Sequence, residues 1–245
     1  MTSRDSNTLY RRLVAEALGT TFLLAAIVGS GIMGERLANG NLAIALLANT
    51  VATGAALVAL ILTFGPISGA HFNPAVTLSD ASLRGIAWMD APLYIGAQFV
   101  GAFIGVAIAN LMFGLPIFFA SHHLRAGAAQ LFSEFIATFG LLAVIWGCAR
   151  TRTAAVPFAV AAYITAACWF TASTSFANPA VTLARAASDT FAGIRPIDTA
   201  GFICAQLLGA AAATLLFRWL TPSLPSVAEA IVLPHKDSGS SHARQ

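Results

Sequence analysis

The hexapeptide Asn73-Pro74-Ala75-Val76-Thr77-Leu78 recurs letter for letter as Asn178-Pro179-Ala180-Val181-Thr182-Leu183. Asn is a strong N-cap residue, because its side-chain oxygen accepts a hydrogen bond from an early backbone N–H, and Pro is favoured at the first helical position. Each copy therefore predicts the start of a short helix, over about residues 74–83 and 179–188. A simple turn is the alternative for a single copy, but two identical copies argue against it.

The segments that contain the two hexapeptides, residues 65–90 and 171–195, include proline and are only half apolar. Each segment is too short for another full membrane span and unusually apolar for an exposed loop. This profile is typical of a re-entrant segment, which is tolerated at membrane depth only where it lines a cavity or is buried in protein.

The rest of the chain is dominated by apolar runs. Of its 245 residues, 58% are hydrophobic and 9% are charged, whereas soluble domains contain about 25% charged residues. This composition excludes a disordered chain, a disulfide scaffold and nearly every class of soluble enzyme. A membrane-spanning helix needs about 20 mostly apolar residues, and six stretches qualify, at about 13–33, 42–64, 92–113, 130–149, 155–175 and 199–220. The sequence therefore predicts an all-α membrane protein with six transmembrane helices plus two re-entrant half-helices.

The positive charges predict the orientation of these spans. With the N-terminus in the cytoplasm, nine of the 13 Lys and Arg residues fall on the cytoplasmic side, as the positive-inside rule requires. Six spans then place both termini of a multi-pass protein on the cytoplasmic side of the cell inner (plasma) membrane. The predicted organisation is a cytoplasmic N-terminus at 1–12, a membrane domain at 13–220 and a polar cytoplasmic tail at 221–245. The cysteines Cys148, Cys168 and Cys204 lie in apolar runs and predict free, buried thiols.

The hexapeptides belong to an internal repeat. Residues 15–20 resemble 133–138, and residues 97–102 resemble 205–210, in the same order as the hexapeptides and at similar spacing. The two halves, about 13–113 and 130–220, each contain three spans, so the second half enters the membrane from the opposite side. Inverted repeats of this kind place a shared site near the bilayer midplane, where discontinuous helices meet.

Inversion makes the two predicted half-helices meet end to end, with both positive dipole ends at the midplane. Because their oxygens are used for capping, the side-chain amides of Asn73 and Asn178 are expected to be free to donate hydrogen bonds to a passing molecule. These features disfavour cations and a continuous proton wire. They favour small neutral molecules that carry acceptor oxygens.

Together with Ser68-Gly69-Ala70-His71-Phe72-Asn73, these motifs resemble those of the aquaporin or major intrinsic protein family over about residues 10–220. The resemblance implies a non-enzymatic channel with a pore in each protomer of a homotetramer, surrounded by membrane lipid. It implies passive flow of water and small uncharged solutes and no cofactor. It also implies that the buried acids Glu16 and Glu134 accept hydrogen bonds from the backbone of the re-entrant segments, with a proton relay as the alternative. Backbone carbonyls are implied to line the pore at Gly69, Ala70, His71, Thr174, Ser175 and Phe176.

The resemblance also places a selectivity filter. Ungapped counting from each Asn gives Thr53, Ala166, Ser175 and Val181 at the four positions of the family's narrow outer constriction. Water-selective members typically have a large aromatic residue, a His, a small residue and an Arg there, and glycerol channels typically keep the Arg. The small side chains of this chain predict a wide filter without Arg, which passes glycerol-type polyols and metalloid hydroxides such as arsenite. Such a filter resembles that of aquaporin-like channels found with bacterial arsenic-resistance functions, for which methylated arsenic species are further candidate solutes.

Three positions keep more than one interpretation. Arg185 lies four residues after Val181, so it either gathers anions at the outer mouth or pairs with Asp189 at i+4. His71 is either a structural residue of the pore or a metal or pH-sensing site, although no second ligand lies at metal spacing. His122 and His123 form either a metal pair or, as we prefer, an ordinary exposed pair in a loop.

Three alternative functions also follow from the sequence. A water-selective or glycerol-selective pore is the alternative within the family. A secondary transporter can also use an inverted repeat with broken helices, but neither re-entrant segment has an acid before its Asn to coordinate an ion. An intramembrane hydrolase would need a nucleophile beside a base, for which only Ser68 and His71 are close in sequence. No pattern indicates a nucleotide, a metal, a cofactor or a nucleic-acid partner.

Overall fold

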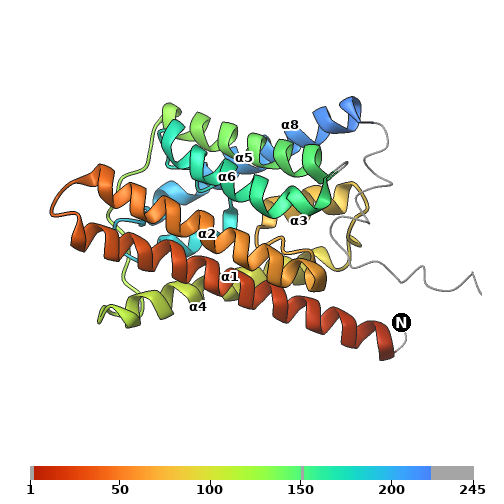
Figure 1. Cartoon of the computed structure of the whole chain (residues 1–245), viewed down its shortest axis with the longest axis horizontal. Coiled ribbons are helices and arrows are strands. Elements are labelled where there is room, and N and C mark those ends of the chain that lie inside the picture. The colour runs from red at the N-terminus through yellow and green to blue at the C-terminus, as the bar shows by residue number, and fades with distance from the viewer. Residues whose placement is uncertain (1–2, 150–151, 222–245) are drawn as a thin grey trace, which may run out of the picture.

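The computed structural model describes residues 3–149 and 152–221. Within these ranges, six long helices and two short ones make up the fold (Figure 1). The long helices are α1 (Ser3–Leu37), α2 (Leu42–Ser68), α4 (Ala91–Met112), α5 (Ala128–Ala149), α6 (Val156–Phe170) and α8 (Thr199–Leu220). The short helices are α3 (Pro74–Ser82) and α7 (Pro179–Arg185), and single 3-10 turns at Thr153–Ala155 and Pro196–Asp198 precede α6 and α8. Within the described ranges, six helices are long and apolar enough to cross a membrane, so the predicted fold class is confirmed.

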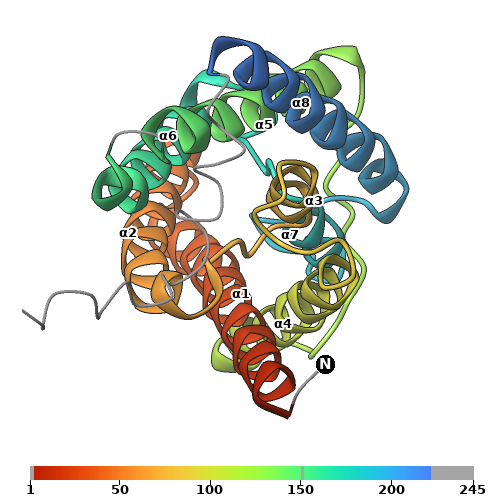
Figure 2. The same cartoon turned by 90° about the vertical axis from the view of Figure 1, so that its right-hand side faces the viewer.

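The long helices form a curved wall around the two short ones. Neighbouring helices contact each other in the order α4, α1, α2, α6, α5 and α8. The short helices α3 and α7 both contact α4 and α8 and fill the space between them. Figure 2, which views the molecule nearly along the helices, shows α3 and α7 inside this wall. The short helices that begin with the repeated hexapeptides therefore both lie between α4 and α8.

Local sequence sets the ends of the helices. The side chain of Asn41 caps α2 by accepting from Ala43 N at 3.1 Å and Ile44 N at 3.2 Å. At its other end, α2 stops at Gly69, whose φ of 88° is left-handed and suits a residue without a side chain. The two Asn-Pro pairs begin α3 and α7 as predicted, since each Asn is an N-cap with Pro at the next position.

Several boundaries differ from the predicted ones. Helix α1 begins at Ser3, so most of the predicted N-terminal segment 1–12 is continuous with the first span. Helix α6 ends at Phe170 rather than at residue 175, because the backbone becomes extended at Thr171. Helix α7 ends at Arg185 rather than at residue 188. Almost all of the predicted tail, residues 222–245, lies outside the described residues.

The outside of the helix wall is apolar. Large side chains such as Phe22 on α1, Val100 on α4 and Leu208 on α8 are exposed. This is the arrangement expected where lipid is the solvent, because lipid tails solvate apolar side chains as well as a protein core does. Cys204 also lies exposed on α8 and Cys148 is only partly buried, so the prediction of buried thiols is wrong for these two residues and confirmed for Cys168.

Glycines bring pairs of helices into close contact at equivalent places in the two halves. A methyl group on Gly101 of α4 would collide with the carbonyl of Ala17 on α1, and one on Gly209 of α8 would collide with the carbonyl of Phe135 on α5. Small residues let helix backbones approach closely in membranes, where dispersion contacts replace the hydrophobic effect as the driving force. In both the α1–α4 pair and the α5–α8 pair, a glycine therefore allows the two helices to approach closely.

Candidate functional site

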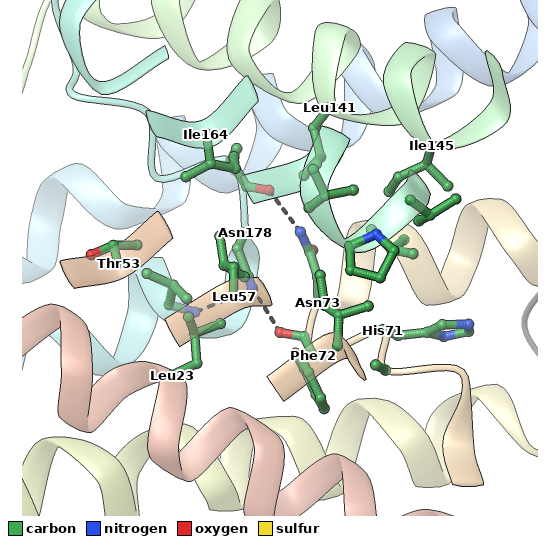
Figure 3. A pocket seen from close by; sticks show the side chains of 18 of the residues that line it. Leu23, Thr53, Leu57, His71, Phe72, Asn73, Leu141, Ile145, Ile164 and Asn178 are labelled. Carbon is green, nitrogen blue, oxygen red and sulfur yellow. Dashed lines mark hydrogen bonds between the residues drawn. The ribbon is translucent and has the colours of Figure 1, made fainter. Parts of the chain in front are cut away.

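A cavity of about 480 Å³ lies between the helix wall and the two re-entrant segments. Its apolar lining comes from α1, α2, α5 and α6, and both re-entrant segments contribute as well. Figure 3 shows Thr53 and His71 on opposite sides of the paired asparagines, so the cavity passes the midpoint of the fold. We call its two ends the Arg185 end, bordered by Thr53, Ser175, Val181 and Arg185, and the His71 end, bordered by Gly69, Ala70 and His71.

The two asparagines at the midpoint each cap their own helix and hold the opposite segment. Asn73 Oδ1 accepts from Ala75 N at 2.9 Å, and Asn178 Oδ1 accepts from Ala180 N at 2.9 Å. Their amide groups donate crosswise: Asn73 Nδ2 to Ala177 O at 2.8 Å, and Asn178 Nδ2 to Phe72 O at 2.7 Å (Figure 3). A side-chain amide has two N–H donors. The expectation that both amides are wholly free is therefore wrong, and one N–H on each is left for a molecule in the cavity.

Glu16 holds the first re-entrant segment to α1. Its Oε1 accepts from Ser68 Oγ at 2.6 Å and from His71 N at 3.0 Å. Its Oε2 accepts from Phe72 N at 2.8 Å and from Gln98 Nε2 at 2.8 Å. Gln98 Nε2 also lies 2.9 Å from Thr77 Oγ1, which links α4 to α3. All four partners donate to this buried carboxylate, which is the structural role that the resemblance implies.

Glu134 holds the second re-entrant segment in the same way. Its two carboxylate oxygens accept from Phe176 N and Ala177 N, both at 2.9 Å. Gln206 Nε2 donates to Glu134 Oε2 at 2.6 Å and to Thr182 Oγ1 at 2.8 Å. Neither Glu16 nor Glu134 lines the cavity, so the contacts favour anchoring of the segments over a proton relay.

The anchored segments contain left-handed residues at equivalent positions. Ala70 and Phe72 have φ of 50° and 49°, and Ser175 and Ala177 have φ of 51° and 48°. A residue with a side chain in this region costs about 1–3 kcal/mol and persists only where its surroundings hold it. The buried carboxylates supply that restraint. All six residues for which pore-lining carbonyls are predicted border the cavity, and the direction of each carbonyl stays a prediction.

The structure brings three of the four predicted filter residues to one end of the cavity. Thr53, Ser175 and Val181 line the Arg185 end, but Ala166 is exposed and does not line the cavity. The residues of α6 that line the cavity are Val156, Pro157, Val160, Ile164 and Cys168, and the last two lie two positions before and after Ala166. A shift of two positions turns a helix by about 200°. Ungapped counting from Asn178 crosses the non-helical residues 171–178 and therefore selects the opposite face of α6, so the prediction for Ala166 is wrong.

Arg185 adds a guanidinium group to this end. It lines the cavity although it is only 6% exposed. Its Nε donates to Ala192 O, and its Cζ lies 3.4 Å from the centre of the Phe176 ring. The predicted pairing with Asp189 is wrong, because Asp189 accepts from His122 N at 2.8 Å and contacts His122 Nδ1 at 2.9 Å. Arg185 therefore brings a positive charge to this end of the cavity, although the four counted positions contain no arginine.

Arg125, which the sequence does not single out, lies at the same end. Its guanidinium donates to Gly193 O at 2.8 Å, Ser173 O at 3.2 Å, Thr174 Oγ1 at 3.3 Å and Phe191 O at 3.4 Å. These bonds tie the loop before α5 to the segments on either side of α7. Arg125 is in a loop without periodicity, so no local signal could have identified it.

The remaining polar candidates are Ser68, His71 and the histidine pair in the loop before α5. His71 Nδ1 lies 3.0 Å from Thr77 Oγ1, and Ser68 Oγ donates to Glu16, so Ser68 and His71 do not form a nucleophile and base pair. The side chain of His122 is 87% exposed, as expected for a loop residue. In the described part of the chain, no three His, Cys, Asp or Glu side chains are grouped closely enough to hold a metal ion.

Comparisons with known proteins agree on one family. The family described as Major intrinsic protein matches residues 3–156 and 148–243. Aquaglyceroporin AqpS of Rhizobium meliloti (strain 1021) is 54% identical over 220 residues, which covers 89% of this chain and 94% of that protein. Putative aquaporin NIP4-1 of Arabidopsis thaliana is 36% identical over 148 residues, but the match covers 60% of this chain and only 51% of the plant protein. The X-ray structure of the aquaglyceroporin from Plasmodium falciparum has the same fold, with a TM-score of 0.65 and 20% identity over 88% of this chain and 98% of that chain.

Proposed function

We propose a solute class for this chain, which belongs to the major intrinsic protein family and is thus a membrane channel for small solutes and not an enzyme. The proposed solutes are uncharged polyols of the glycerol type, water and metalloid hydroxides such as arsenite. Flow is passive and follows the concentration gradient. Methylated arsenic species of similar shape belong to the same proposed solute class.

The observation that carries this proposal is the size of the side chains around the Arg185 end. Thr53, Ser175 and Val181 are all small, and Val181 stands where the family usually has an arginine. The cavity of about 480 Å³ is far larger than the volume of about 30 Å³ that one water molecule takes up in the liquid. Its wall combines hydroxyl groups with apolar side chains such as Leu57 and Ile164. A polyol or a metalloid hydroxide presents both kinds of surface.

The charges along the path disfavour cations. The helices α3 and α7 both begin at the paired asparagines, so two positive dipole ends meet there. Among the described residues that line the cavity there is no Asp or Glu. A secondary transporter would want such acids to coordinate its coupling ion, so this lining supports a channel over a transporter.

The proposal includes placement in the cell inner (plasma) membrane with both termini in the cytoplasm. Arg11 and Arg12 lie near the start of α1, at the end of the molecule opposite to Arg185, so the positive-inside rule turns the Arg185 end outward. Residues 13–220 form the proposed channel unit and 221–245 its cytoplasmic tail. The exposed apolar faces of α1, α4 and α8 support contact with membrane lipid and with three further copies in a homotetramer.

The substitution Val181→Arg tests the proposal. A guanidinium at this position fills the space between Thr53 and Ser175, so uptake of glycerol and arsenite into proteoliposomes is expected to fall at least about tenfold. Water permeability is expected to fall less, because water needs less room. The measurement is light scattering after an osmotic step, for water, glycerol and urea, with arsenite uptake measured directly.

Val181→Ala is the matched control, because it keeps the room and should keep uptake at the wild-type level. If Val181→Arg leaves glycerol and arsenite uptake unchanged, the placement of the filter is wrong. If the wild-type protein passes water but no solute, the water-selective alternative replaces the proposal. Uptake that saturates and needs a proton gradient would instead indicate a transporter.

A further inference from the structure

Two arginines, Arg185 and Arg125, meet at the Arg185 end of the cavity and contact the same aromatic ring. The Cζ atoms of Arg185 and Arg125 lie 3.4 Å and 5.0 Å from the centre of the same ring, that of Phe176. Over the described ranges, neither arginine forms an ion pair with Asp or Glu. The acids of this region have other partners, since Glu134 binds the second re-entrant segment, Asp189 binds His122 and Asp198 binds Arg195.

The two guanidinium groups differ in how many of their donors are used. All three guanidinium nitrogens of Arg125 donate hydrogen bonds to carbonyl and hydroxyl oxygens of the surrounding loops. Arg185 uses only Nε, and in the described structure its two terminal nitrogens have no hydrogen-bond partner. Because Arg185 lines the cavity, its unused donors are available to a molecule inside it. Arg125 therefore supplies only charge, whereas Arg185 supplies charge and two terminal nitrogens that can donate hydrogen bonds to a ligand.

Two hydroxyl groups at the same end also lack partners. Thr53 and Ser175 are each only 6% exposed, and within residues 3–149 and 152–221 neither Thr53 Oγ1 nor Ser175 Oγ has a hydrogen-bond partner. Buried polar groups are normally satisfied, and an unpaired buried charge is costlier still. One oxygen-bearing anion would satisfy the free nitrogens of Arg185 and both hydroxyls. A guanidinium fork matches the planar oxygens of such an anion in particular.

We propose that the Arg185 end of the cavity binds a small planar monovalent oxyanion, of the nitrate or carboxylate class, between Arg185, Thr53 and Ser175. The inference rests on the proposed function, because the site lies on the same path that the neutral solutes use. Beyond it the wall is lined by Leu57, Leu141, Ile145 and Ile164. Moving a charge into such a section is strongly unfavourable. The bound anion therefore stays at this end and competes with neutral solutes.

The test measures how nitrate affects glycerol uptake by proteoliposomes. Sodium nitrate replaces sodium gluconate, which is too bulky for the site, at constant osmolality and ionic strength. Nitrate is expected to slow glycerol uptake by the wild-type protein in a saturable way. In Arg185→Gln the nitrate concentration for half inhibition is expected to rise at least about tenfold, which corresponds to about 1.4 kcal/mol. Arg185→Lys should keep part of the effect, because it retains the charge without the fork.

Arg36→Gln is the matched control, since it removes one positive charge from the same end of the molecule at an exposed position. It should be inhibited by nitrate as the wild-type protein is. The proposal is overturned if nitrate does not slow glycerol uptake by the wild-type protein. It is also overturned if nitrate inhibits the wild-type protein and Arg185→Gln equally.

A second readout does not depend on conduction. Purified protein in detergent should unfold at a higher temperature in nitrate than in gluconate, because a ligand of the folded state stabilises it. This shift should be present in Arg36→Gln and absent in Arg185→Gln, and a shift that persists in Arg185→Gln overturns the proposal. If the wild-type protein passes no glycerol but keeps an Arg185-dependent shift, the proposed function fails while the anion site stands.

Discussion

Asp80 and Arg185 occupy equivalent positions in the two halves of the repeat, and they carry opposite charges. Their contacts are equivalent as well, because His71 and Phe176 occupy matching positions in the two halves. Asp80 Oδ2 lies 3.7 Å from His71 Nε2, and Arg185 lies over the ring of Phe176. Nearer the midpoint, the two halves are almost identical in their caps, their left-handed residues and their buried glutamates. The comparison indicates that repeated residues build the narrow middle of the path, and that unrepeated residues give each end its own chemistry.

Removing the buried carboxylates should have the largest effect and should reveal a difference between the halves. Glu16 accepts four hydrogen bonds and Glu134 accepts three, because Ser173, the counterpart of Ser68, bonds to Thr171 instead. Bonds to a charged acceptor are worth about 1.5–3 kcal/mol each. Glu16→Gln and Glu134→Gln should each lower the free energy of unfolding by about 3 kcal/mol or more, with the larger loss in Glu16→Gln. Thermal unfolding in detergent measures this, and a larger loss in Glu134→Gln would contradict the count of partners.

Replacing the glycine at each close helix contact should destabilise the two halves to a similar degree. Gly101→Ala and Gly209→Ala force a methyl group against a carbonyl of the facing helix, and such overpacking costs about 1–3 kcal/mol. Gly96→Ala is the control on α4, because nothing lies within 4 Å of the added methyl group. It should leave the unfolding temperature unchanged or raise it. If Gly101→Ala and Gly96→Ala unfold alike, the α1–α4 contact is looser than the structure shows.

A smaller effect should come from Asp80, whose carboxylate is buried. In the described structure, neither of its oxygens has a hydrogen-bond partner. Asp80→Asn removes a charge that the site does not satisfy, so it should stabilise the protein by about 1 kcal/mol.

Asp189→Asn should have the opposite sign and serves as the control for Asp80→Asn. Hydrogen bonds from His122 lower the pKa of Asp189 below its ordinary value of 3.8. Its contribution to stability is therefore present above that value and is lost as the pH falls through the lowered pKa. Near neutral pH, Asp189→Asn should cost less than about 1 kcal/mol at this partly exposed site. Unfolding temperatures of both variants across a pH series check the two signs together, and a loss of stability in Asp80→Asn near neutral pH would show that the carboxylate has a partner.

Local patterns were enough to predict the spans, the two half-helices and the caps. Apolar runs and an Asn-Pro pair act through neighbouring residues, so the structure that they favour can be predicted without the rest of the fold. The resemblance to a known family added the anchoring role of Glu16 and Glu134. The prediction for Ala166 failed because a residue count cannot cross a non-helical segment and still select the correct face of a helix.

The charges at the Arg185 end depend on contacts that are distant in sequence. Arg185 and Asp189 are spaced for an i,i+4 pair, but α7 ends at Arg185, and His122, which is 67 residues away in sequence, binds Asp189 instead. Arg125 reaches the site from a loop with no periodic pattern. Such partners are set by tertiary structure, which the local sequence does not contain.

The crosswise bonds of the asparagines also constrain how the protein is made. Asn73 donates to Ala177, which lies 104 residues later in the chain, and Phe72 accepts from Asn178, 106 residues later. While the ribosome is still producing the second half, the first re-entrant segment has a donor and an acceptor without their final partners. An unsatisfied backbone group inside a bilayer costs several kcal/mol. We therefore expect the first re-entrant segment to reach its final position only after its counterpart has been inserted.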